Sequence, residues 1–194
     1  MKEKITGLIL AGGKASRMGG SDKGLIAFKG QPMVAHVIQR LSPQVGEILI
    51  NANREIETYQ SLSFTVITDE ISDFAGPLAG LHAGMKAAKT EFLLSVPCDS
   101  PLLPEDLSQR LMAALELQQA DIAVAKTGEQ HHPVFCLCRT SLVQDLEDFL
   151  NAGGRKVEGW QKQHAYVEVS FDDNPSAFSN VNTPEELSKL EGES

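Results

Sequence analysis

A glycine-rich, basic loop at residues 10–23 is the first segment whose residues could do chemistry. It reads LAGGKASRMGGSDK, and its four glycines would let backbone N–H groups crowd around an anion. Arg17 and Lys23 add positive charge that would offset the mutual repulsion of phosphates. The glycine spacing fits neither a Walker A loop nor GxGxxG, so a solvated surface turn is the alternative interpretation. Its place directly after an apolar run favours phosphate binding.

Polar side chains also follow other apolar runs. Asp99 comes after the apolar run 92–96, where a carboxylate is costly unless it meets solvent, a cation or a turn. It could cap the next helix or hold Mg²⁺, and beside a triphosphate the Mg²⁺ role is favoured. Asp69 and Asn51 could each accept hydrogen bonds from a nucleoside, although Asp69 fits a polar turn almost as well. Gly76 opens a segment of small residues against which a nucleoside could lie.

Three further groups have weaker signals. Asn180 and Asn182 precede the last predicted helix, and Asn182 could shape the helix entry, bind Mg²⁺ or contact a second substrate. His132 belongs to an adjacent histidine pair whose members would point to opposite sides of a strand, which argues against zinc. We expect His132 to make polar contacts at a rim. Arg155 with Lys156 could bind an acceptor phosphate, or could complement the dipole at a helix end.

The elements that must position these residues follow an alternating pattern. Apolar runs predict strands, and segments of helical periodicity predict helices between them, which is typical of an α/β domain with a mostly parallel sheet. The predicted strands cover 6–11, 48–50, 64–67, 92–96, 122–124, 134–137 and 166–171. The predicted helices cover 32–41, 78–89, a segment from 104, 142–150 and a segment from 183. Ligands of open parallel sheets bind beyond the carboxyl ends of the strands, so Gly12, Asn51 and Asp99 are predicted to converge on one crevice.

Length and charge restrict the class of protein. The 194 residues fit one domain, and 42% hydrophobic residues argue against disorder. A net charge of −9 argues against a nucleic-acid or anionic-membrane surface. No apolar run approaches the roughly 20 residues of a membrane span, and the first residues lack the pattern of a signal peptide. We therefore expect a cytoplasmic protein.

The three cysteines, Cys98, Cys136 and Cys138, form neither an even disulfide set nor a CxxC pair. Cys136 and Cys138 alternate with apolar residues, which predicts two thiols on one face of a strand. We interpret them as core residues, and metal or redox chemistry is the less favoured alternative.

Taken in order, these motifs resemble those of the nucleotide-diphospho-sugar transferase type of nucleotidyltransferase. Within that group the chain resembles the molybdenum cofactor guanylyltransferase family, close to its enterobacterial form. The motifs are LAGG at 10–13, RMG at 17–19, DK at 22–23, NANR at 51–54, Asp69, GPLAG at 76–80, PCD at 97–99, HP at 132–133, GRK at 154–156 and NVNTPEEL at 180–187. The resemblance spans about residues 5–190. It implies one Rossmann-like three-layer domain over 1–194, with nucleotide binding up to about residue 100 and acceptor binding in 101–194.

The resemblance also implies an activity. In that family GMP from GTP is joined to the terminal phosphate of molybdopterin, and pyrophosphate is released. The implied cofactor is Mg²⁺, with Mn²⁺ as a substitute, and the implied metal ligand is Asp99. Arg17, Lys23 and Asp99 would be catalytic, because such transfers depend on positioning and electrostatics and the acceptor phosphate is already a nucleophile. The implied nucleotide contacts are Leu10, Ala11, Gly12, Gly13, Gly20, Lys23, Asn51, Asp69, Gly76 and Asp99. The implied acceptor contacts are His132, Arg155, Asn180 and Asn182.

Two departures from the family pattern concern the acceptor side. Lys156 stands where a second Arg is usual, and Glu158 and Gly159 follow where apolar residues are usual. Two other functions stay open: a cytidylyltransferase of the same fold, and a non-catalytic nucleotide-gated carrier of molybdopterin. Gly12 and Gly13, where cytidine-using relatives usually show Ala then Gly, favour GTP, and Arg17 with Asp99 favours an enzyme. We expect a monomer with transient contacts to proteins that supply molybdopterin or mature molybdoenzymes.

Overall fold

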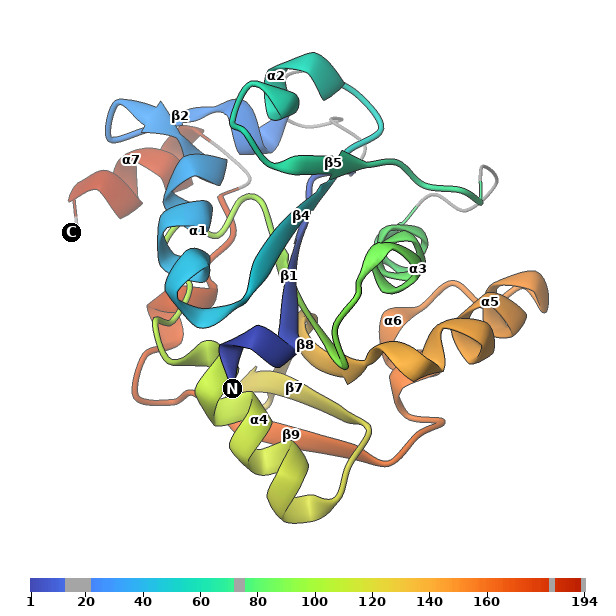
Figure 1. The fold of residues 1–194 in the computed structure, drawn as a ribbon. Helices are drawn as coiled ribbons and strands as arrows, with labels where there is room; N and C mark the ends of the chain where they lie inside the picture. The colour runs from blue at the N-terminus through green and yellow to red at the C-terminus, as the bar shows by residue number, and fades with distance from the viewer. Residues whose placement is uncertain (13–21, 72–75, 182–183, 193–194) are drawn as a thin grey trace.

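One mixed sheet forms the centre of the molecule (Figure 1). The computed structural model describes residues 1–12, 22–71, 76–181 and 184–192. Among these residues seven strands pair in the order β5-β4-β1-β6-β8-β7-β9. All run parallel except β8, which is antiparallel to both of its neighbours. The strands are β1 (Ile5–Leu10), β4 (Glu47–Asn51), β5 (Thr65–Ile67), β6 (Phe92–Pro97), β7 (Ile122–Thr127), β8 (Gln130–Arg139) and β9 (Tyr166–Ser170).

Helices cover both faces of this sheet, which confirms the predicted three-layer α/β fold (Figure 1). One face carries α1 (Met33–Leu41) and α4 (Leu107–Gln118), and the other carries α3 (Pro77–Ala87), α5 (Val143–Asn151) and α6 (Val157–Gln161). Because side chains alternate along a strand, Ile9 packs toward α1 while Leu8 packs toward α3. Burial on both faces explains why β1 has a nearly continuous apolar sequence.

Smaller elements lie outside the sheet. A hairpin of β2 (Ala27–Phe28) and β3 (Gln31–Pro32) precedes α1, and α2 (Ile56–Gln60) follows β4. The 3₁₀ turn Lys23–Leu25 comes just before the hairpin, and α7 (Pro184–Gly192) is the last helix. The sequence pattern did not predict the hairpin, α2 or α6, because segments this short have no readable period. In the described residues, no helix is both long enough and apolar enough to cross a membrane.

The interpretation of the cysteines as core residues is confirmed. Cys98, Cys136 and Cys138 are free thiols, and all three are buried. Cys136 and Cys138 share one face of β8 and belong to the same apolar cluster as Leu8. Burial raises the pKa of the Cys98 thiol, so it stays in the unreactive protonated form.

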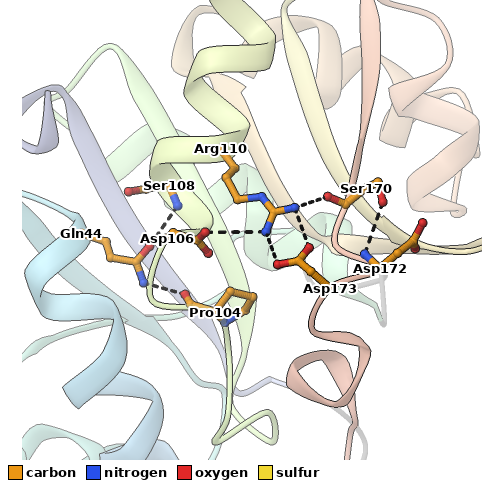
Figure 2. A network of polar contacts seen from close by, with 8 residues as sticks. All are labelled: Gln44, Pro104, Asp106, Ser108, Arg110, Ser170, Asp172 and Asp173. Atoms are coloured by element: carbon orange, nitrogen blue, oxygen red, sulfur yellow. Dashed lines mark hydrogen bonds and ion pairs between the residues drawn. The ribbon is translucent and has the colours of Figure 1, made fainter.

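The helix predicted from Pro104 begins later, at Leu107, and this part of the prediction is wrong. Residues 105–106, expected in the first helical turn, precede the helix instead. Backbone groups at the helix start hydrogen-bond with Gln44, whose buried side chain lies at the end of the 3₁₀ turn Ser42–Gln44. Its Oε1 accepts the N–H of Ser108 at 2.9 Å, and its Nε2 donates to the carbonyl of Pro104 at 2.9 Å (Figure 2). This long-range cap is invisible in the local sequence.

A second contact fixes α4 on its other side (Figure 2). Arg110 donates to both carboxylate oxygens of Asp173 at 3.0 Å and to the carbonyl of Ser170 at 2.5 Å. The guanidinium carbon also lies 3.9 Å from the ring centre of Phe171. A bidentate pair stacked on an aromatic ring suits Arg and would not suit Lys. Together, Gln44 and Arg110 place the start of α4, and with it the chain that follows Asp99.

Replacing Gln44 by Ala should lower the free energy of unfolding by about 2 kcal/mol, because the Pro104 carbonyl and the Ser108 N–H would lose their buried partner. Urea denaturation of the wild type and the variant measures the difference. Gln163→Ala, at an exposed position, is the matched control and should change stability little. Equal losses in the two variants would show that the Gln44 side chain does not fix the helix start.

Candidate active site

A cavity of about 260 Å³ opens at the carboxyl edge of the sheet, beyond the ends of β1, β4, β5 and β6. This is the edge at which parallel α/β sheets bind ligands. The cavity brings together nine of the residues that the sequence analysis singled out, which are Leu10, Ala11, Gly12, Lys23, Asn51, Asp69, Gly76, Asp99 and Asn180. The segments that were expected to converge therefore do so.

The charged centre of this cavity is a pair formed by Lys23 and Asp99. The Lys23 ammonium donates to Asp99 Oδ2 at 3.3 Å. Asp99 is only 7% exposed, and burial raises the pKa of its carboxyl, while the Lys23 charge opposes the rise. A carboxylate withdrawn from water in this way needs a cation beside it. Lys23 supplies this cation, and the pair therefore places one positive and one negative group at the carboxyl end of β6.

A hydrogen-bonded group around Asp69 forms another wall. Asn51 Nδ2 donates to Asp69 Oδ1 at 2.8 Å, and Asn53 Nδ2 donates to Asp69 Oδ2 at 2.9 Å. The backbone N–H of Asp69 donates in return to Asn53 Oδ1 at 2.9 Å. These bonds join the end of β4 to the end of β5 and fix the Asp69 carboxylate. Carboxylate oxygens have further lone pairs, so Asp69 can still accept hydrogen bonds from a ligand.

Gly12 lies in close contact with this wall. A Cβ on Gly12 would lie 2.9 Å from Asn53 Nδ2 and 3.1 Å from Asn51 Oδ1. The chain after β1 thus passes so close to the Asp69 group that only glycine leaves it undisturbed. Glycine at this position therefore avoids a steric clash with the two asparagine side chains, and it also leaves the backbone accessible to a ligand.

The C-terminal segment reaches the cavity through Asn180. Ser100 Oγ donates to Asn180 Oδ1 at 2.7 Å, and the N–H of Val181 donates to the carbonyl of Asp99 at 3.2 Å. Both bonds fasten the segment before α7 to the loop that carries Asp99. The acceptor role expected for Asn180 stays a prediction, but its position beside Asp99 is consistent with it.

The structure does not bring His132 and Arg155 to this cavity. The His132 ring stacks on Phe178 with 4.6 Å between ring centres and shares a hydrogen bond of 2.8 Å with Thr127 Oγ1. Burial lowers the pKa of His132. The Arg155 guanidinium donates to the carbonyl of Leu150 at 3.1 Å, near the end of α5. That contact fits the helix-end alternative left open for Arg155, and the substrate contacts of both residues remain predictions.

Four predicted site residues, Gly13, Arg17, Gly20 and Asn182, lie outside the described residues. The sequence analysis named no individual ligand contact for the other residues that line the cavity, which are Asp22, Pro77, Pro97, Cys98 and Val134. Asp22 could have been found from the sequence, because an Asp directly before a turn is a common cap. Val134 could not, because only the pairing of β8 with β6 brings it to the cavity.

The oxygen atoms that could bind a metal at this cavity fit a hard divalent cation. The described residues contain no cluster of three His, Cys, Asp or Glu side chains able to hold a metal by themselves. Mg²⁺ does not need such a cluster, because it usually binds one or two carboxylates and completes its shell with water and substrate phosphates. The Asp99 carboxylate at the cavity wall is suited to this role, and the Asn180 amide oxygen already accepts a bond from Ser100.

A mostly parallel sheet with a charged cavity at its carboxyl edge defines a Rossmann-like nucleotide-binding protein. The sequence narrows this class further: residues 7–167 match the MobA-like NTP transferase domain, and the chain belongs to that family. A molybdenum cofactor guanylyltransferase of Cupriavidus metallidurans is 50% identical over 197 residues, covering 99% of this chain and 97% of the relative. One of Ralstonia pickettii is 52% identical over 195 residues, covering 96% and 95%.

A solved structure agrees with the fold. Molybdopterin-guanine dinucleotide biosynthesis protein A of Archaeoglobus fulgidus superposes with a TM-score of 0.79 over 96% of this chain and 97% of its own. Its sequence identity is 21%, so the agreement concerns the backbone arrangement. The Rossmann-like nucleotidyltransferase fold predicted from the sequence is confirmed.

Replacing Lys23 by Met should cost more stability at neutral pH than at acid pH. Without the Lys23 charge, the pKa of Asp99, already raised by burial, rises further. A folded-state pKa above the unfolded value of about 3.9 means that stability falls as pH rises from the unfolded toward the folded pKa. At acid pH Asp99 is protonated in both states, and the loss vanishes.

Urea denaturation in metal-free buffer at about pH 3 and about pH 7.5 tests this, with an expected extra loss on the order of 2 kcal/mol at the higher pH. Lys162→Met is the control, since Lys162 pairs with Glu158 on the surface at 3.8 Å and its loss should matter little. A Lys23→Met effect of equal size at both pH values would contradict the pairing.

Proposed function

We propose that this chain transfers GMP from GTP to the terminal phosphate of molybdopterin, with release of pyrophosphate and formation of molybdopterin guanine dinucleotide. Family membership and relatives named molybdenum cofactor guanylyltransferase support this activity. The single observation that carries it is that the Lys23–Asp99 pair and the Asp69 group line one cavity at the carboxyl edge of the sheet. A nucleoside triphosphate needs a charged surface for its phosphates next to a hydrogen-bonding surface for its nucleoside.

The reaction requires no protein nucleophile. An oxygen of the acceptor phosphate attacks the α-phosphorus of GTP, and the bond from that phosphorus to the α–β bridging oxygen breaks with its electron pair leaving on pyrophosphate. Because the acceptor is already an anion, the task of the chain is to hold two polyanions in line and to offset their charge. In this proposal Lys23 acts on the phosphates, and Arg17, outside the described residues, assists from the glycine-rich loop.

The nucleoside would lie against the Asp69 group. Guanine presents N–H donors at N1 and N2, and ribose presents hydroxyl donors, which the fixed Asp69 carboxylate or Asn51 amide oxygen can accept. Small residues at Gly76 and Gly12 keep backbone close to this position. Asn180 would face the acceptor, together with Asn182, His132 and Arg155.

Asp99 would hold Mg²⁺, with Mn²⁺ as a substitute. The bound cation would neutralise phosphate charge that Lys23 alone does not balance. We further propose a cytoplasmic monomer that meets molybdopterin-supplying and molybdoenzyme-maturing proteins transiently.

The metal role of Asp99 can be tested by removing divalent ions. EDTA should abolish turnover, and Mg²⁺ or Mn²⁺ should restore it. Turnover that persists in EDTA would contradict the metal role.

The proposed base specificity can be measured directly. Pyrophosphate release is followed with molybdopterin, Mg²⁺ and either GTP or CTP, and we expect GTP to have the higher kcat/KM. The acceptor-free reaction is the control for simple hydrolysis. Preferred use of CTP would replace the guanylyl transfer by cytidylyl transfer, and binding of GTP without pyrophosphate release would remove the catalytic proposal.

Asp99→Ala should reduce kcat by on the order of 10²–10³, the usual effect of losing one preorganised electrostatic group at a reacting centre. The fold should survive, because Asp99 lies at the edge of the sheet and not in its apolar core. Steady-state kinetics with GTP and Mg²⁺, together with far-UV circular dichroism, separate the two effects. Asp121→Ala, on the surface next to Arg139, is the matched carboxylate control and should keep normal turnover.

A further inference from the structure

Tyr59 is a buried side chain whose only polar atom points toward the active site. It lies on α2 and is 0% exposed. Its hydroxyl donates to Asp22 Oδ1 at 2.5 Å. Burial and the neighbouring carboxylate raise the pKa of Tyr59, so the hydroxyl keeps its proton and remains a donor.

Asp22 uses the same oxygen to shape the turn that follows it. Asp22 Oδ1 also accepts the N–H of Gly24 at 3.1 Å, which caps the 3₁₀ turn Lys23–Leu25. The Asp22 carbonyl accepts the N–H of Leu25 at 3.1 Å. A side chain held by two donors has little freedom, so Tyr59 fixes the cap and the cap fixes the turn.

The turn is packed as well as hydrogen-bonded. A Cβ on Gly24 would lie 2.6 Å from the Tyr59 hydroxyl oxygen and 3.0 Å from Cys98 Cβ. The turn is therefore held between α2 on one side and the residue before Asp99 on the other. This position puts the first residue of the turn, Lys23, beside the Asp99 carboxylate.

We propose that Tyr59 is a positioning residue for the transfer reaction: through Asp22 it holds the turn that aims the Lys23 ammonium at Asp99 and at the phosphates of the nucleotide. This inference rests on the proposed function. The segment from the end of β4 to α2 would then hold two parts of the site. Asn51 and Asn53 fix the Asp69 carboxylate, and Tyr59 fixes the Lys23 turn.

The test is a double-mutant cycle on pyrophosphate release with GTP, Mg²⁺ and molybdopterin. Tyr59→Phe keeps the ring and removes only the hydroxyl, and we expect kcat to fall roughly tenfold because a displaced charge at the reacting centre is costly. In a Lys23→Met background the same substitution should change kcat by less than about twofold, because the group it positions is gone. Loss of packing alone would act equally in both backgrounds.

Two variants complete the experiment. Tyr166→Phe removes the hydroxyl of the other of the two tyrosines, which contacts Glu168 at 3.5 Å on β9, and should leave kcat unchanged. Asp22→Ala, on a partly exposed turn, should lower kcat as Tyr59→Phe does, and the loss should likewise depend on Lys23. This variant replaces Tyr59→Phe in the test if Tyr59→Phe does not fold. Thermal unfolding of every variant checks the fold.

The outcomes are distinguishable. An unchanged kcat in Tyr59→Phe, or equal losses with and without Lys23, overturns the positioning role while the proposed function stands. A normal kcat in Lys23→Met also overturns it, because Tyr59 would then have nothing to act through. A wild-type protein that releases no pyrophosphate defeats the proposed function itself.

Discussion

A carboxylate withdrawn from water at the edge of the sheet is the constraint around which the site is arranged. Burying Asp99 without a partner would cost several kcal/mol or force it to bind a proton. Lys23 provides the partner, although 76 residues separate the two in the chain. Every contact that fixes either residue therefore affects the charge of the cavity. The loop after β6, the turn before the hairpin and the segment around Asn180 all serve this one pair.

The second constraint is the direction of the strands. β1, β4, β5 and β6 run parallel, so their carboxyl ends meet at one edge and bring loops from the whole N-terminal half together. The antiparallel strand β8 extends this edge in a different way. Ser95 pairs with Cys136, so the chain just before Cys136 runs beside the carboxyl end of β6 and delivers Val134 to the cavity. One reversed strand thus lets the C-terminal half contribute to a site built on parallel strands.

Long-range polar contacts set the details. Gln44 caps α4 from a turn that lies about 60 residues earlier, and Tyr59 holds Asp22 from α2, the helix that follows β4. Both are buried amphipathic side chains whose apolar bodies fit the core and whose polar atoms reach a loop. Such residues read as ordinary core or turn residues in the sequence, because their partners are chosen by the fold and not by their neighbours.

The sequence by itself determined the layered α/β fold, most strand and helix positions, the buried thiols and the set of loops that meet at the cavity. It could do so because periodicity and the chirality of parallel crossovers leave few alternatives. It did not determine the late start of α4, the positions of His132 and Arg155 away from the cavity, or the contact between Tyr59 and Asp22. Only the tertiary structure decided these, since each depends on side-chain atoms that meet within hydrogen-bonding distance after the chain has folded, and spacing along the chain does not encode that distance.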